Sequence, residues 1–124
     1  MTKRPGTLLI VEDDALIAAQ IEDAVKQAGY QALPPVRTAS EAMDLARAHH
    51  PDLALVDIAL DGQLNGIQLA SQLRDELNIR SIFISGHNDP QTVSESRLAH
   101  PASWLKKPFA PGSVVASVQL ALKG

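Results

Sequence analysis

Leu53-Ala54-Leu55-Val56-Asp57 is a short apolar run that follows Pro51-Asp52 and ends on a carboxylate. A run of this length is typical of a strand buried on both faces of a parallel sheet. Asp57 then stands at the carboxyl end of the strand, and ligands of open parallel sheets bind outside those ends. The alternative is an Asp that only begins a turn.

Four more apolar runs predict strands. They are Thr7–Val11, 30–36, Ser81–Ser85 and Ser103–Lys106. The first leads into Glu12 and Asp13, the third ends on Ser85, and the last is followed by Lys107. The second contains Pro34-Pro35, which cannot donate ladder hydrogen bonds, so this strand is expected at an edge of the sheet.

Apolar residues at helical spacing predict a helix after each strand. The first begins at Asp14, a residue type common at N-caps, and ends at Gly29. The second begins at the capping box Thr38-Ala39-Ser40-Glu41. The fourth, from Asp89 or Pro90 to about residue 99, is mostly polar and is expected to be among the more mobile elements. The expected inward-facing residues are Leu16, Ile17, Ile21, Ala24, Val25, Ala28, Ala42, Leu45, Ala46, His49, Ile67, Leu69, Ala70, Leu73, Leu77, Val93, Leu98, Val114, Val115, Val118, Leu120 and Leu122.

Strands that alternate with helices form a parallel sheet covered on both faces and joined by right-handed crossovers. The predicted fold is a doubly wound α/β domain with the flavodoxin-like strand order 2-1-3-4-5. This order puts Asp13 beside Asp57, with Ser85 and Lys107 on the same rim. Residues 1–124 are expected to form one domain, with residues 1–6 as a flexible tail.

The composition argues against several classes of protein. Without cysteine the chain has no disulfide and no zinc-thiolate site, and the cytoplasm is the expected compartment. The basic start Thr2-Lys3-Arg4 lacks the apolar region of a signal peptide, and no segment reaches the roughly 20 apolar residues of a membrane span. A net charge of −3 with scattered Lys and Arg argues against a nucleic-acid surface.

The acids expected on the rim indicate a metal site. Glu12, Asp13 and Asp57 repel one another unless a cation lies among them. Oxygen ligands without His or Cys favour Mg²⁺, which keeps several waters and often binds a substrate phosphate. Such a metal neutralises phosphoryl oxygens while a neighbouring Asp attacks phosphorus. Lys107 and Ser85 supply a charge and a hydroxyl for the same oxygens.

Together these segments resemble the receiver domain of the response regulators of two-component signalling, and the resemblance covers essentially the whole chain. It rests on Leu9-Ile10-Val11-Glu12-Asp13-Asp14, Asp52-Leu53-Ala54-Leu55-Val56-Asp57, Ile82-Phe83-Ile84-Ser85-Gly86 and Lys107-Pro108-Phe109. It implies a CheY-like fold and a switch that accepts a phosphoryl group from a sensor histidine kinase or a histidine phosphotransfer protein. The switch then alters its contacts with a downstream target protein. It implies no enzyme beyond a domain that catalyses its own phosphoryl transfer and dephosphorylation.

The resemblance also implies roles for the rim residues. Asp57 would be the phosphoryl acceptor, and Glu12 and Asp13 the acidic pair that holds Mg²⁺, with Asp13 as a direct ligand. Ala59 would add its backbone carbonyl to the metal ligands. Many receivers have Pro four residues and Gly eight residues after the acceptor, whereas here Asp61 stands first and the glycine, Gly66, comes nine after. The loop is therefore one residue longer. Asp61 is interpreted as a turn former before the glycine at position 62, with an extra acid near the metal as the alternative.

Further residues are implied to sense the phosphate. Lys107 would bind it and precede a cis bond to Pro108, and Ser85 would be the switch hydroxyl. Trp104 stands at the family's aromatic switch position, although an aromatic beside a sheet end is also commonly plain core. The histidines, His49, His50, His87 and His100, lack metal-ligand spacing, while His87 stands where the family's residue influences water access.

Two other functions would use some of the same residues. A small Mg²⁺-dependent phosphohydrolase would also use Asp57 as nucleophile, but it normally needs a substrate lid and a second acid at the position of Ala59. A receiver-like binding module that no longer takes phosphate would not need the acidic rim. No DNA-binding or enzymatic output region follows the last helix, which predicts output by protein contact unless the chain is a fragment.

Overall fold

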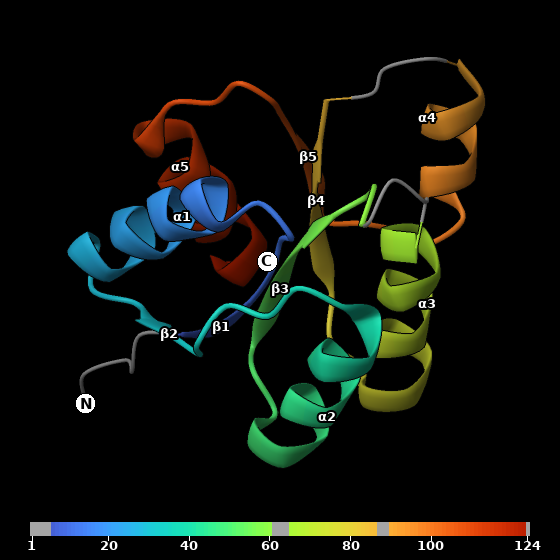
Figure 1. Cartoon of the computed structure of the whole chain (residues 1–124), viewed down its shortest axis with the longest axis horizontal. Coiled ribbons are helices and arrows are strands. Elements are labelled where there is room, and N and C mark those ends of the chain that lie inside the picture. Colours follow the sequence, from blue (N-terminus) through green and yellow to red (C-terminus); the bar gives the residue numbers. More distant parts are fainter. Residues whose placement is uncertain (1–5, 61–64, 87–89, 124) are drawn as a thin grey trace.

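The computed structural model describes residues 6–60, 65–86 and 90–123, whose arrangement Figure 1 shows. Within them, five parallel strands form one sheet in the order β2-β1-β3-β4-β5. The strands are β1 (Thr7–Val11), β2 (Gln31–Ala32), β3 (Leu53–Asp57), β4 (Ser81–Ser85) and β5 (Ser103–Lys106). The helices are α1 (Ala15–Gln27), α2 (Ala39–His49), α3 (Asn65–Leu77), α4 (Pro90–Arg97) and α5 (Pro111–Lys123). The predicted strand order is confirmed.

The central strands are apolar because both of their faces are covered. Every residue of β3 and β4 is buried, and so are residues 8–11 of β1. Val11 of β1 pairs with Val56 of β3, and Asp57 pairs with Ile84 of β4. The residues that end these three strands therefore reach the same edge of the sheet.

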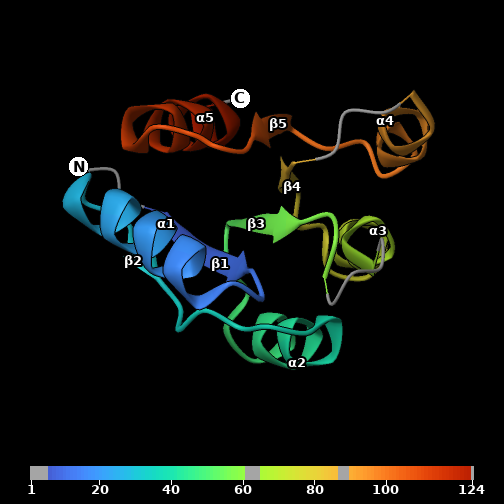
Figure 2. The ribbon, with the colours of Figure 1, turned by 45° about the horizontal axis from the view of Figure 1, so that its top comes forward.

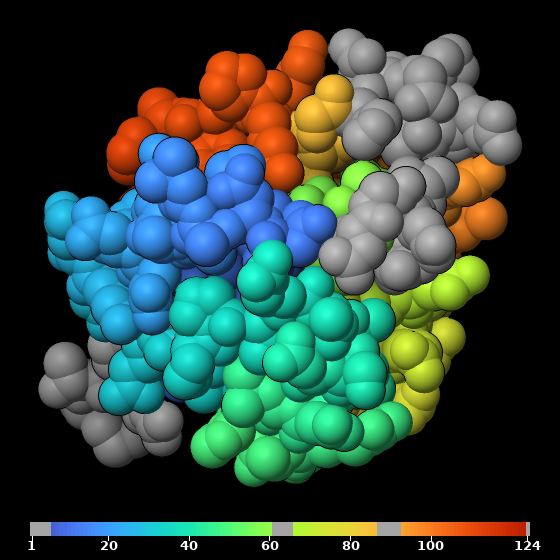
Figure 3. Space-filling view, in the orientation of Figure 1, coloured from blue at the N-terminus to red at the C-terminus, as the bar shows by residue number. Residues whose placement is uncertain are grey.

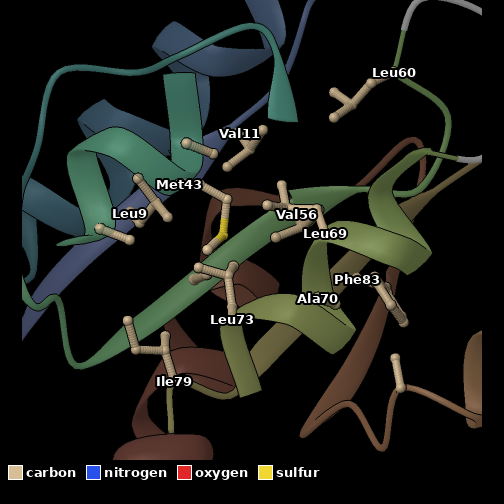
Figure 4. Close-up of a cluster of buried hydrophobic side chains, with 14 of the residues drawn as sticks. Leu9, Val11, Met43, Val56, Leu60, Leu69, Ala70, Leu73, Ile79 and Phe83 are labelled. Atoms are coloured by element: carbon tan, nitrogen blue, oxygen red, sulfur yellow. The ribbon is translucent and has the colours of Figure 1, made fainter. Parts of the chain in front are cut away.

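Helices cover both faces of the sheet, as Figure 2 shows. α1 and α5 lie on one face, and their apolar cluster includes Leu8, Ile10, Ile21, Val25, Leu55, Ile82, Ile84, Leu105, Val114 and Val118. α2 and α3 lie on the other, where the cluster in Figure 4 includes Leu9, Val11, Met43, Val56, Leu69, Leu73, Ile79 and Phe83. Successive residues of a strand point to opposite faces, so each central strand supplies both clusters.

The first two helices begin at the predicted caps. Asp14 Oδ1 accepts hydrogen bonds from the N–H groups of Leu16 and Ile17, at 2.9 and 3.2 Å. Thr38 Oγ1 accepts one from the Glu41 N–H at 3.1 Å, and the Glu41 side chain accepts one from the Thr38 hydroxyl at 3.1 Å. These contacts satisfy N–H groups that have no partner within the helix.

Several residues expected on inward helix faces are exposed instead, which corrects the sequence prediction. Leu16, Leu98 and Leu120 are 69%, 73% and 72% exposed, and Ala28 and His49 are also exposed. The buried stripes are centred elsewhere, with Ala18 in α1, Met43 in α2, Ala99 after α4 and Ala121 in α5. Because a helix turns about 100° per residue, a stripe that contains Ala18 or Ala121 leaves Leu16 or Leu120 outside it.

β2 is an edge strand, as predicted, but it is much shorter than residues 30–36. Hydrogen bonds from this segment to β1 and the residue before it are Gln31 N to Gly6 O, Leu33 N to Leu8 O, and Val36 N to Ile10 O. The last two donors are three positions apart while their acceptors are two apart, so Pro34-Pro35 forms a bulge. Beyond the bulge, the Val36 carbonyl accepts a hydrogen bond from the Glu12 N–H at 3.0 Å. The bulged edge therefore supports the backbone of the acidic rim.

Candidate functional site

Three carboxylates gather at the carboxyl edge of the sheet. Glu12 and Asp13 follow β1 directly, and Asp57 ends β3. One carboxylate oxygen from each of the three lies within 4.8 Å of the other two. In Figure 3, green atoms that follow β3 lie recessed beside the blue atoms that follow β1. The proximity of Asp13 and Asp57 follows from the neighbouring positions of β1 and β3 in the sheet.

Lys107 lies between two of these carboxylates. Its Nζ atom is 3.2 Å from Glu12 Oε2 and donates a hydrogen bond to Asp57 Oδ2 at 3.3 Å. Its backbone N–H donates to the Ser85 carbonyl at 2.9 Å, which joins the ends of β4 and β5. The Lys107–Pro108 peptide bond is cis. The structure thus brings groups from β1, β3, β4 and β5 to one site.

Backbone N–H groups orient the two buried carboxylates. Glu12 Oε1 accepts a hydrogen bond from the Asp14 N–H at 3.1 Å, and Asp57 Oδ1 accepts one from the Ala59 N–H at 3.0 Å. Glu12 is 1% exposed and Asp57 is 4% exposed. Each carboxylate therefore uses one oxygen for a backbone donor and turns the other toward the Lys107 ammonium.

The close approach of these groups changes their protonation. Burial, together with the hydrogen bond to Asp57 and its negative charge, raises the pKa of Glu12 to about 7, although the Asp14 N–H and the Lys107 ammonium oppose the rise. Burial lowers the pKa of Lys107, but the charges of Asp57 and Glu12 outweigh burial, so this pKa lies above its usual value. Near neutral pH, Glu12 therefore holds a proton part of the time while Lys107 remains charged.

The residues fit a hard divalent cation. They surround a cleft of about 450 Å³ that is lined by Glu12, Asp13, Asp14, Asp57, Ala59, Gly86 and Lys107. The side-chain ligand atoms available from the clustered acids are carboxylate oxygens. Crowding of buried carboxylates disfavours their ionised forms, and a nearby cation reverses this effect. Oxygen ligands of this kind suit Mg²⁺, which binds through one or two carboxylates and keeps waters.

Gly66 packs directly against the backbone that carries Asp57. Its N–H donates a hydrogen bond to the Ile58 carbonyl at 2.9 Å. A Cβ atom at position 66 would lie 2.1 Å from the Asp57 carbonyl oxygen and 2.7 Å from the Ile58 Cα atom. This close approach admits only glycine. In the sequence, the spacing from Asp57 is the only signal of this role.

Trp104 is not plain core, because 44% of it is exposed. It pairs with Phe83, so its side chain lies on the α3 side of the sheet. The indole Nε1–H donates a hydrogen bond to Ser96 Oγ at 3.0 Å. Ser96 is fully buried, whereas Leu98, which the sequence pattern favours, is exposed. The spacing of Val93 and Ser96 with the buried alanine at position 99 is the signal that identifies the true inner face.

Several predictions fall outside the described residues. They concern the two alternatives for Asp61, the lengthened loop at 61–64, the water-access role of His87, the possible helix start at Asp89, and a tail at residues 1–5. Gly6, the last residue of the expected tail, accepts a hydrogen bond from the Gln31 N–H at 3.0 Å.

The described histidines stand apart from the acidic cluster. His49, His50 and His100 are exposed, and no described histidine belongs to a group of residues that could hold a metal ion. No helix in the described ranges is long and apolar enough to cross a membrane.

Comparisons with known proteins agree with this architecture. A family model for the response regulator receiver domain matches residues 8–119. The transcriptional regulatory protein PdtaR of Mycobacterium tuberculosis is 27% identical over 118 residues, which are 95% of this chain and 57% of PdtaR. The polar-differentiation response regulator DivK of Brucella ovis is 39% identical over 82 residues, which are 66% of this chain and 63% of DivK. The matched part is therefore less than two thirds of either relative.

A solved structure gives the same result for the fold. The signal receiver domain of a modulated diguanylate cyclase from Desulfovibrio desulfuricans superposes with a TM-score of 0.89 and 34% sequence identity. The match covers 96% of this chain and 94% of that domain. The predicted CheY-like form of the flavodoxin-like fold is thus confirmed.

Proposed function

The chain belongs to the family of response regulator receiver domains, and we propose that it is a switch in which Asp57 accepts a phosphoryl group. The observation that carries this proposal is the position of Lys107 Nζ, 3.3 Å from Asp57 Oδ2 and 3.2 Å from Glu12 Oε2. A fixed ammonium beside a buried carboxylate is suited to pair with the oxygens of a phosphoryl group attached there.

The proposed reaction moves one phosphoryl group. An Asp57 carboxylate oxygen forms the new bond to phosphorus as the bond from phosphorus to a donor histidine nitrogen breaks, and that nitrogen keeps the electron pair. The hydrogen bond from the Ala59 N–H fixes the carboxylate orientation for this attack. Lys107 then neutralises charge on the phosphoryl oxygens, and the Ser85 hydroxyl donates a hydrogen bond to one of them.

Mg²⁺ is the proposed cofactor of this transfer. We assign it to Asp13, Asp57 and the backbone carbonyl of Ala59, with Glu12 completing the acidic pair. When bound, the ion neutralises negative charge on the phosphoryl oxygens. One carboxylate oxygen from each of the three acids already lies within 4.8 Å of the other two, and Mg²⁺ binds through carboxylate oxygens of this kind.

The phosphoryl donor is proposed to be a sensor histidine kinase or a histidine phosphotransfer protein, and the output a changed contact with a downstream protein. We place this exchange in the cytoplasm and assign no reaction on an external substrate. A hydrolase that used Asp57 as nucleophile would need an acid near the leaving group. The residue two positions later is Ala59, which contributes only backbone groups to this site.

Intact-mass measurement tests the proposal. The protein is incubated with Mg²⁺ and a small phosphodonor, and the parent is expected to gain the mass of one phosphoryl group. Asp57→Asn is expected to fold normally and to gain none, because an amide is a far poorer nucleophile than a carboxylate. Equal labelling of the parent and the variant would exclude Asp57 as the acceptor.

A further inference from the structure

Trp104 and Ser96 form a side-chain contact between β5 and α4. The indole Nε1–H donates a hydrogen bond to Ser96 Oγ at 3.0 Å. Trp104 is 44% exposed, while Ser96 beneath it is 0% exposed. Because buried polar groups need hydrogen-bond partners, the buried Ser96 hydroxyl must be satisfied by neighbouring groups.

The Ser96 hydroxyl is already oriented within its own helix. It donates its proton to the Val93 carbonyl at 2.8 Å, so toward the indole it acts as an acceptor. An indole nitrogen is a donor only, so the two groups are complementary. The buried Ala99, 3% exposed, anchors the chain just after α4. Ser96 Oγ is therefore a fixed acceptor. If the indole moves relative to α4, its hydrogen bond to Ser96 is lost.

We propose that Ser96 is a positioning residue that holds the Trp104 indole in its half-exposed location and so opposes phosphorylation of Asp57. The proposal rests on the proposed function and on the aromatic-switch position that the resemblance implies for Trp104: we take Ser85 to move toward the phosphoryl group and the Trp104 ring to move inward after it. Trp104 pairs with Phe83, two residues before Ser85 on the adjacent strand, so the aromatic ring lies near the end of β4. An inward shift of the ring breaks the hydrogen bond to Ser96.

The hydrogen bond therefore contributes to the equilibrium between the two positions of the ring. A ligand changes such an equilibrium only by its differential affinity for the two states, so part of the affinity for a phosphoryl group is used to break this contact. Removing the acceptor while leaving the helix intact should raise that affinity. A net hydrogen bond corresponds to a population ratio of about two- to tenfold.

The first test uses the protein without metal or phosphate. Trp104 is the only tryptophan in the chain, so its indole N–H gives one proton resonance. Ser96→Ala is expected to shift this resonance and to speed its exchange with water, because the acceptor is lost. Ser94→Ala is the matched control, since Ser94 is an exposed serine in the same helix. Equal spectra for both variants and the parent would show that the hydrogen bond is absent in solution.

The second test measures binding of beryllofluoride, a phosphoryl mimic, in the presence of Mg²⁺. Ser96→Ala is expected to bind it about two- to tenfold more tightly than the parent, while Ser94→Ala and Ser96→Thr keep the parent affinity. Failure of the parent to bind would refute the proposed function. If the parent binds but Ser96→Ala binds with equal or lower affinity, only the proposed role of Ser96 is wrong.

Trp104→Phe provides an independent variant, because it removes the indole donor but keeps an aromatic ring. It is expected to bind the mimic about as tightly as Ser96→Ala, as measured by thermal stabilisation. Combining the two changes should add no further gain, since both remove the same hydrogen bond. Additive effects on affinity would show that Ser96 acts by some route other than Trp104.

Discussion

The raised pKa of Glu12 predicts that Mg²⁺ binding depends on pH. Burial and the neighbouring Asp57 raise this pKa to about 7 in the metal-free protein. A carboxylate must lose its proton to support a bound metal. About one Glu12 side chain in eleven is ionised at pH 6, and about ten in eleven at pH 8. The apparent affinity for Mg²⁺ should therefore rise about tenfold, or about 1.4 kcal/mol, between these pH values.

Thermal unfolding with and without Mg²⁺ measures this difference. A Mg²⁺ concentration about ten times the apparent Kd at pH 8 stabilises the protein by about 1.4 kcal/mol, and the same concentration at pH 6 by about 0.4 kcal/mol. For a chain of this length, about 4 °C of melting temperature corresponds to 1 kcal/mol. The expected increases in melting temperature are thus about 6 °C at pH 8 and about 2 °C at pH 6.

The proton on Glu12 opposes Mg²⁺ binding, but it stabilises the metal-free protein. The pKa of Glu12 is about 7 in the folded protein against an ordinary value of 4.5, so between these values the folded state binds more protons than the unfolded chain. The free energy of unfolding therefore falls as pH rises through this window, by no more than about 3.4 kcal/mol. Urea unfolding in EDTA should record this fall for the parent.

Glu12→Gln removes the titration with little change of shape. Both pH effects should then disappear, and the variant should be more stable than the parent in EDTA at pH 8. Glu76→Gln is the matched control, because Glu76 is an exposed glutamate on α3, and it should behave like the parent. If Glu12→Gln retains the parent's dependence of Mg²⁺ affinity on pH, another group titrates and this reasoning is wrong.

Three further changes test the site. Asp13→Ala should abolish both the thermal stabilisation by Mg²⁺ and phosphodonor labelling; unchanged stabilisation would exclude Asp13 as a ligand. Gly66→Ala should lower the free energy of unfolding in urea by about 1–3 kcal/mol or more, because its Cβ would lie 2.1 Å from the Asp57 carbonyl oxygen; parent stability would contradict that contact. Ser85→Ala should still bind beryllofluoride without the parent's change in Trp104 fluorescence, and a full-amplitude change would refute that coupling.

The bounds of the central strands could be predicted to the residue because short apolar runs between turn residues are typical of buried strands. Runs such as Thr7–Val11 and Ser81–Ser85 are too short for a helix, and their interior positions are apolar and buried. Once their order was set, the positions of Asp13 and Asp57 followed from the strand ends. The strand order and the residues at the strand ends together therefore account for most of the site.

The helix faces were less predictable because periodicity gives a direction but not the width of the buried stripe. Leu16 and Leu120 fit the pattern and are nevertheless exposed, since small residues nearby occupy the contact with the sheet. Ser96 shows the reverse case. Its spacing from the buried Ala99 marks the inner face of α4, but its hydrogen bond to Trp104, eight positions later and on a different element, is encoded by no local pattern.

The need for a cation in the acidic cluster follows both from the sequence and from the structure. Repulsion among Glu12, Asp13 and Asp57 requires a positive charge, and in the structure the Lys107 ammonium meets part of this requirement. Three ionised carboxylates and one ammonium still leave two negative charges. The raised pKa of Glu12 removes one of them by retaining a proton near neutral pH. A divalent cation would replace that proton and neutralise the remainder, so the unusual pKa and the proposed Mg²⁺ site have the same electrostatic cause.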